Sequence, residues 1–146
     1  MFTIRKLFRF EMAHQLAKAF SRCCSDTIHG HTYTLEVFFK SEVLDETDMV
    51  VDFGEIKQLI KEYVESWDHS LVMPGFLNPE YLNMLEKYCA NLKIVPYNPT
   101  AEAMSRDMFY TIKELVKPII ERSNREIKLH AIRLHETQTG YAEYSE

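Results

Sequence analysis

The chain is poor in cysteine, with only three among its 146 residues: Cys23, Cys24 and Cys89. An odd number of cysteines argues against a disulfide framework. Cys23 and Cys24 are adjacent, and a disulfide between neighbouring residues would strain the backbone. We therefore predict that all three thiols are free.

Long apolar runs and a surplus of basic residues are also lacking. No stretch approaches the roughly 20 apolar residues that span a bilayer, and the N-terminus lacks the pattern of a signal peptide, so we expect a cytoplasmic protein with no membrane partner. The net charge of −5 argues against a nucleic-acid partner, because nucleic-acid binding needs a basic face. Residues 1–22 nevertheless carry five basic residues against Glu11 alone, a charge of +4 that suits a small anionic ligand.

Four segments have the apolar alternation or composition of strands. Because no repeat, low-complexity tract or linker divides the chain, we expect one domain over residues 1–146. Alternation over residues 2–12 and 32–40 predicts two strands, and a turn near Thr137 separates the other two. The second pair covers residues 126–136 and 139–145.

In the middle of the chain, apolar residues recur at the spacing of helices. One helix is predicted after Asp52, with Glu55 completing a capping box, and another after Thr100, with Pro118 limiting its regular end. A short helix around 78–91 and a short strand near 92–95 fit the segment between them. The order of two strands, two main helices and two strands (ββααββ) predicts an α+β fold with both helices on one face of an antiparallel sheet.

Three histidines are placed to meet at the end of the first strand pair. His29 and His31 are two residues apart in extended chain, so their side chains point to the same side, and His14 continues the first strand in matching register. Three neutral imidazoles with a vacant fourth position are typical of catalytic zinc. The alternative is a pair of hydrogen-bonded histidines at a strand end.

Cys24 lies in the long loop that precedes these histidines. Beside a zinc ion and Arg22, its pKa should fall below the ordinary value, which would make a thiolate available as a base. Cys23 is a close competitor for this role. Alternatively, one thiol is the fourth zinc ligand, and the site is then closed and structural.

Two further polar positions stand out. Asp68 directly precedes His69, and a carboxylate can orient an imidazole for proton transfer, although a histidine at a helix C-terminus is also favoured by the helix dipole. Glu136 is in phase with the apolar residues of its strand, so its carboxylate is predicted to point inward. A buried carboxylate needs a partner, and two N–H groups of a ligand would supply one.

In combination these residues resemble the family of 6-pyruvoyl-tetrahydropterin synthases and 6-carboxy-tetrahydropterin synthases. The matching stretches follow the family's order over nearly the whole chain. They are Phe10–His14, Cys24, His29–Tyr33, Val51–Phe53, Trp67–His69, Asn98–Glu102 and His135–Thr137.

The resemblance implies a T-fold, with a four-stranded antiparallel sheet and two helices, assembled into an oligomeric barrel as a homohexamer of paired trimers. It implies that 7,8-dihydroneopterin triphosphate binds between subunits. The ligands of a Zn²⁺ cofactor would be His14, His29 and His31. Catalytic proton transfer would involve Cys24, Asp68 and His69, while Glu136 would anchor the pterin ring and Thr100 and Glu102 would lie near it.

Three reactions are compatible with this resemblance. We favour the 6-carboxy synthase, a zinc-dependent lyase of queuosine biosynthesis, because the overall pattern is similar to bacterial members. The alternatives are the 6-pyruvoyl synthase and a folate-type side-chain cleavage, whose enzymes tend to carry glutamate in place of Cys24. A non-catalytic module held together by zinc is the alternative from another class. The cysteine doublet and a longer segment at 74–97 depart from the family pattern.

Overall fold

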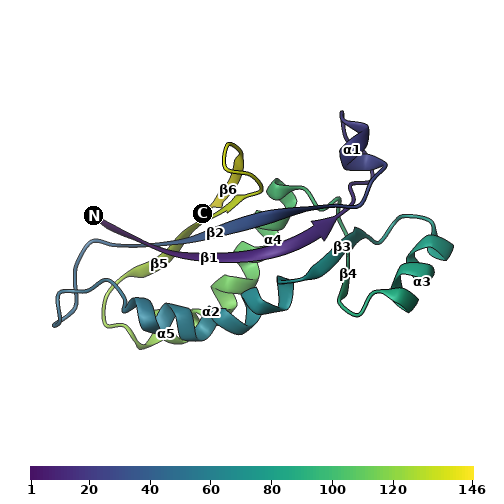
Figure 1. The fold of residues 1–146 in the computed structure, drawn as a ribbon. Helices are drawn as coiled ribbons and strands as arrows, with labels where there is room; N and C mark the ends of the chain where they lie inside the picture. Colours follow the sequence, from purple (N-terminus) through teal and green to yellow (C-terminus); the bar gives the residue numbers. More distant parts are fainter.

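The two longest strands lie side by side at the centre of the sheet. In the computed structural model, which describes residues 1–146, β1 (Phe2–His14) and β2 (His29–Ser41) pair antiparallel from Phe2↔Ser41 to His14↔His29 (Figure 1). Both strands are longer than their alternation predicted. The additional residues at the end of β1 and the start of β2 place His14 opposite His29. The pairing of these two histidines therefore holds the ends of the loop at residues 15–28 together.

The C-terminal strands continue the sheet on the β2 side. β5 (Ile127–His135) pairs antiparallel with β2, with a register shift between Phe38 and Phe39, and β6 (Tyr141–Ser145) pairs antiparallel with β5. The predicted turn lies between these two strands. These four strands form the expected antiparallel arrangement.

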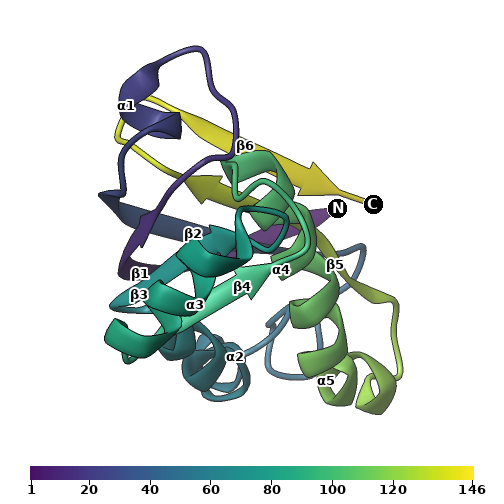
Figure 2. The same ribbon diagram turned by 90° about the vertical axis from the view of Figure 1, so that its right-hand side faces the viewer.

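The prediction of a four-stranded, wholly antiparallel sheet is wrong. Two short strands, β3 (Ser70–Pro74) and β4 (Leu92–Val95), add to the other edge in parallel, and the six-stranded order is β4-β3-β1-β2-β5-β6. The apolar run of β3 has no alternation, because a strand inside a sheet can be buried on both faces. Figure 2 shows α3 (Pro79–Tyr88), the crossover between them, beside β3 and β4.

The main helices cover one face of the sheet, as predicted. Figure 1 shows α2 (Phe53–Trp67), α4 (Ala101–Leu115) and α5 (Lys117–Arg122) on the same side. A core of 24 buried residues fills the space between these layers. None of these helices, nor the one-turn α1 (Arg22–Ser25), combines the length and apolar character needed to cross a bilayer.

The caps of the main helices come from residues that the sequence singled out. The Asp52 carboxylate accepts a hydrogen bond from the Gly54 backbone N–H at 2.6 Å, and the Thr100 hydroxyl accepts one from Ala103 at 3.3 Å. The capping box is not formed, because the Glu55 carboxylate pairs with Arg122 of α5. The break between α4 and α5 lies at Val116, two residues before Pro118.

Candidate metal centre

The three predicted histidines come together where β1 ends and β2 begins. Each offers a ring nitrogen, and these nitrogens all lie within 4.8 Å of one another. The convergence follows from strand geometry, since His14 is paired with His29 and the side chain of His31 points to the same face. His14 is fully buried, and His29 and His31 are partly buried. These residues can hold a metal ion.

Backbone carbonyls fix the tautomers of two of these imidazoles. His14 donates from Nδ1 to the Pro99 carbonyl at 2.9 Å, and His29 donates from Nδ1 to the Thr27 carbonyl at 3.0 Å. A carbonyl only accepts, so both Nδ1 atoms carry hydrogen and both neutral rings keep a lone pair on Nε2. The two Nε2 atoms are 3.0 Å apart, where their lone pairs repel unless a cation lies between them.

His31 completes the case for a metal ion. Its Nε2 atom is buried and has no hydrogen-bond partner in the chain, which is costly for a polar atom unless a ligand satisfies it. Burial lowers the pKa of His14 and of His31, so both rings favour the neutral form that binds metal. Three imidazoles, two of them oriented by backbone acceptors, form a donor set that can hold a metal ion.

The Glu136 carboxylate borders this imidazole cluster. Its Oε1 atom lies 3.5 Å from His14 Nε2 and 3.9 Å from His31 Nε2, and it accepts a hydrogen bond from the Tyr33 hydroxyl at 3.4 Å. The side chain is 33% exposed, so its other oxygen can reach a ligand. The inward orientation predicted from the strand pattern is therefore observed.

The cysteine doublet places its two thiols differently. Cys23 is exposed and its thiol lies 2.8 Å from the Ser21 hydroxyl, whereas Cys24 is partly buried. Partial burial raises the pKa of the Cys24 thiol, and so do the contact with Cys23 and the negative charge of Glu136.

The expected effect of Arg22 on Cys24 is wrong. The Arg22 guanidinium pairs with Asp26 at 2.7 Å, four residues along the chain, instead of with the thiol. It is the pKa of Cys23 that is lowered, because the thiol receives hydrogen bonds from Ser21 and Cys24.

Asp68 and His69 form the predicted dyad at the edge of β1. Asp68 Oδ2 lies 2.8 Å from His69 Nδ1, while its Oδ1 accepts a hydrogen bond from the Glu11 backbone at 2.7 Å. These hydrogen bonds, first that from Glu11, lower the pKa of Asp68. His69 has φ of 56°, a left-handed conformation that is strained for a non-glycine residue.

No hydrogen bond joins the His69 side chain to the imidazole cluster of its own chain, but His69 and His31 line the same cavity. His69 is 80% exposed, and this cavity of about 570 Å³ is also lined by Glu11, Thr32 and Cys89. Glu11 and Thr32 are hydrogen-bonded at 2.8 Å on the sheet face away from the helices. The chain therefore presents the dyad outward, at the start of β3.

Thr100 and Glu102 lie at the start of α4, next to the carbonyl that holds His14. Thr100 caps this helix, and Glu102 is exposed in its first turn. The two preceding residues have roles that the sequence did not reveal. The Pro99 carbonyl orients His14, and the Asn98 side chain accepts from the Ala17 N–H at 2.7 Å. A conspicuous Asn-Pro before a helix was the only signal.

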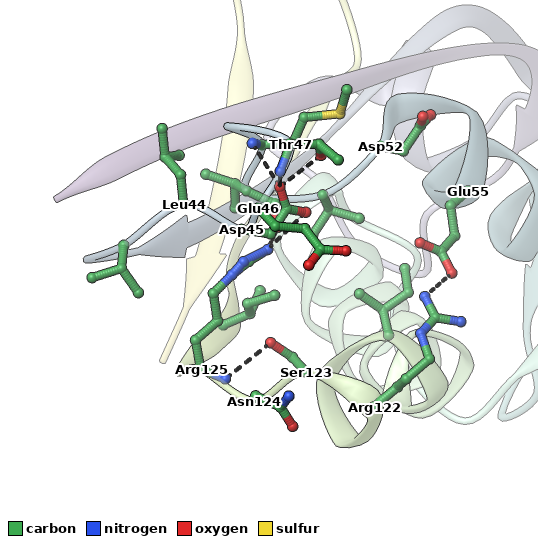
Figure 3. A pocket seen from close by; sticks show the side chains of 16 residues that line it. Leu44, Asp45, Glu46, Thr47, Asp52, Glu55, Arg122, Ser123, Asn124 and Arg125 are labelled. Carbon is green, nitrogen blue, oxygen red and sulfur yellow. Dashed lines mark hydrogen bonds and ion pairs between the residues drawn. The ribbon is translucent and has the colours of Figure 1, made fainter.

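A larger cavity elsewhere contains none of the predicted site residues. It has a volume of about 690 Å³ and lies between the segment after β2 and the junction of α5 and β5, at the end of β2 opposite His29 (Figure 3). Its two arginines are already paired with carboxylates. Arg122 binds Glu55, and Arg125 lies 3.5 Å from Asp45 (Figure 3).

Comparison with known proteins agrees with this geometry. The chain is 33% identical over 141 residues to 6-carboxy-5,6,7,8-tetrahydropterin synthase of Helicobacter pylori strain J99, covering 96% of this chain and 70% of that protein. It is 35% identical over 164 residues to the protein of the same name from Aquifex aeolicus, with 98% and 97% covered.

Solved structures show the same fold. The structure of Caenorhabditis elegans 6-pyruvoyl tetrahydropterin synthase superposes with a TM-score of 0.70 at 19% identity, covering 99% of this chain and 95% of that one. The family model described as 6-pyruvoyl tetrahydropterin synthase matches residues 3–146. The chain therefore belongs to the 6-pyruvoyl tetrahydropterin synthase family.

Proposed function

We propose that this chain is a zinc-dependent 6-carboxy-5,6,7,8-tetrahydropterin synthase. It would convert 7,8-dihydroneopterin triphosphate and water to 6-carboxytetrahydropterin, acetaldehyde and triphosphate. The observation that carries the proposal is the set of three imidazoles whose ring nitrogens all lie within 4.8 Å of one another, beside the partly exposed carboxylate of Glu136. The relatives in Helicobacter pylori and Aquifex aeolicus support the choice of the carboxy reaction.

Different residues of the site would bind the metal and the pterin. His14, His29 and His31 would hold zinc, which when bound supplies Lewis acidity towards the two hydroxyls of the substrate side chain. Glu136 would accept N–H hydrogen bonds from the amide-and-amine edge of the pterin, near Thr100 and Glu102. A charge-assisted pair of this kind gives both orientation and affinity.

Proton transfer would use one thiol and one imidazole. Cys24, as thiolate, would accept a proton from the substrate side chain. His69, oriented by Asp68, would exchange the second proton with the side chain and ring. Because no hydrogen bond joins the dyad to the cluster of its own chain, the dyad would serve a substrate bound between subunits of a homohexamer. Lys18 is exposed while Arg22 is paired with Asp26, so Lys18 is the better candidate for the triphosphate.

The remaining alternatives are distinguished by their products. The 6-pyruvoyl reaction keeps the side chain attached, and folate-type cleavage leaves a hydroxymethyl group, although Cys24 stands where glutamate is expected for the latter. A purely structural zinc site would use Cys24 as fourth ligand, yet the group of residues whose ligand atoms converge contains histidines only.

Incubation of the zinc-loaded protein with 7,8-dihydroneopterin triphosphate tests the proposal. We expect 6-carboxytetrahydropterin and acetaldehyde in equal amounts, identified by mass. His29→Ala should lose both zinc and turnover, whereas His130→Ala, which removes a histidine outside the cluster, should keep both. A pyruvoyl or hydroxymethyl product would replace the proposed reaction, and unchanged substrate with zinc bound would exclude all three.

A further inference from the structure

The loop that carries Cys24 has little internal structure of its own. Residues 15–28 contain only the single turn α1, and most of their side chains are exposed, with Phe20 at the fully exposed tip. The pairing of His14 with His29 fixes the two ends of the loop. The position of Cys24 therefore depends on a few contacts between the loop and the rest of the chain.

Gln15 links the residue after Cys24 to the rest of the fold. Its Nε2 donates to the Ser25 carbonyl at 2.8 Å, and its Oε1 accepts from the Tyr81 hydroxyl at 2.7 Å. A carbonyl can only accept, so these partners specify the orientation of the amide. The next residue, Leu16, donates its backbone N–H to the Cys24 carbonyl at 3.0 Å. The two residues that follow His14 thus bind Cys24 and Ser25: Leu16 binds the Cys24 carbonyl, and Gln15 binds the Ser25 carbonyl.

Tyr81 brings this contact from a different part of the fold. It lies on α3, whose residues Leu82 and Leu85 pack with Met73 of β3 in a small core separate from the main one. The Asn78 side chain caps the helix and accepts from the Tyr81 backbone. The hydroxyl is consequently held in place by the longer segment at 74–97, at the same end of the sheet as α1 (Figure 1).

Asn98, the other side chain that holds this loop, acts on a different part of it. It binds the backbone of Ala17 and of Lys18, on the N-terminal side of the loop tip. Among the side-chain hydrogen bonds that link the loop to the rest of the chain, the path from Tyr81 through Gln15 is the one that reaches the cysteine side. It does so through hydrogen bonds, whose directionality fixes position more narrowly than apolar packing.

We propose that Tyr81 and Gln15 are positioning residues that set the place of the Cys24 thiol, and that this is the role of the 74–97 segment in the reaction. The inference rests on the proposed function where it treats Cys24 as the base. A base displaced by about an ångström loses much of its rate while the substrate still binds, because proton transfer depends steeply on geometry.

Tyr81→Phe removes the hydroxyl and keeps the ring. We expect kcat to fall about tenfold with KM and zinc content unchanged within about twofold. Tyr88→Phe is the matched control, since it makes the same change on the same helix at a 75% exposed residue whose hydroxyl has no hydrogen bond in the chain. Gln15→Met keeps a side chain of similar size but removes the hydrogen bonds to both Ser25 and Tyr81, so it should lower kcat further than Tyr81→Phe.

Alkylation of Cys24 by iodoacetamide provides a second readout that does not need turnover. In a Cys23→Ser, Cys89→Ser background, Tyr81→Phe should speed alkylation about fivefold because a released loop exposes the thiol, and Tyr88→Phe should not. Equal alkylation and equal kcat in the two tyrosine variants would overturn the inference, as would loss of zinc in Tyr81→Phe. If the wild-type protein shows no turnover, the proposed function fails and alkylation alone decides the positioning role.

Discussion

At the scale of single residues, one backbone contact decides which atom of His14 can bind a metal. The Pro99 carbonyl accepts a hydrogen bond from the Nδ1–H group of His14. The neutral ring therefore has its lone pair on Nε2, which faces His29. The same arrangement recurs between His29 and Thr27. Acceptors of this kind fix the ring orientation of a metal ligand and increase its basicity.

The cysteine doublet provides a test at this scale. Cys24→Ala should abolish turnover, with kcat lower by at least about a thousandfold, because it removes the proposed base next to the cluster. Cys23→Ala should reduce kcat by no more than about threefold, because this thiol is exposed and bound to Ser21. Both variants should retain zinc, measured as metal per chain. Loss of zinc in Cys24→Ala would instead indicate a closed, structural site.

The charge of Glu136 can be tested with an isosteric change. Glu136→Gln keeps the shape of the side chain but removes the carboxylate that would receive the pterin N–H groups. A charged hydrogen bond contributes about 1.5–3 kcal/mol, so kcat/KM should fall about 10- to 100-fold. Zinc content should not change, since the metal-binding group consists of histidines. Unchanged kcat/KM would remove Glu136 from the site.

At the scale of secondary-structure elements, a charged cluster ties three strands together on the face away from the helices. Glu36 of β2 is only 3% exposed and pairs with Arg5 of β1 and with His135 and Arg133 of β5. Burial raises the pKa of this carboxyl, but hydrogen bonds from His135 and Arg5 outweigh burial and the net shift is downward. The ionised form is thus favoured in the folded protein.

Replacement of this carboxylate should therefore destabilise the sheet in a pH-dependent way. Glu36→Gln should lower the free energy of unfolding by about 1–2 kcal/mol at pH 7, a modest value because its cationic partners are partly exposed. A lowered folded-state pKa contributes stability above the ordinary value of 4.5, and this stability is lost as the pH falls below it.

Guanidinium unfolding at a fixed protein concentration measures this effect. The difference between wild type and Glu36→Gln should be constant above about pH 5 and shrink as the pH falls below 4.5 and through the lowered folded-state pKa, where Glu36 becomes protonated and resembles glutamine. Glu126→Gln is the control, since this carboxylate is exposed and its pair with Lys128 should contribute less than about 0.5 kcal/mol. A difference that is independent of pH would contradict the role of the charge.

At the scale of the whole molecule, most of the hydrophobic core lies apart from the imidazole cluster. The cluster lies at the β1–β2 end where the long loop begins, beside the core residue Tyr33, while most of the 24-residue core lies between the sheet and the helices. Burial of apolar surface is the dominant favourable term in folding. The fold should consequently not depend on the metal.

Metal removal tests this separation. Treatment with a chelator should abolish turnover and leave the far-UV circular dichroism spectrum unchanged, and added Zn²⁺ should restore activity. A structural zinc site predicts the reverse, with loss of secondary structure on chelation. His29→Ala should lack turnover and have the same circular dichroism spectrum as the chelated wild-type protein. If the chelated protein alone loses secondary structure, the chelator acts on something other than this site.

Several features were predictable because neighbouring residues encode them. Alternation over β1 and β2 identified the strand pair, and the two-residue spacing of His29 and His31 placed both rings on one face. The match in register with His14 then predicted the convergence that the structure shows. The caps at Asp52 and Thr100 were likewise local, since each involves an N–H two or three residues away.

The remaining features depend on residues that are distant in sequence. The parallel addition of β3 and β4, the Pro99 carbonyl that orients His14 from 85 residues away, and the path from Tyr81 to the cysteine loop left no periodic signal. Side-chain periodicity reports which face of an element is buried, and it does not report which distant atom that face meets. The sequence therefore determined which residues could form the metal site, and tertiary packing decided which atoms of these residues point into it.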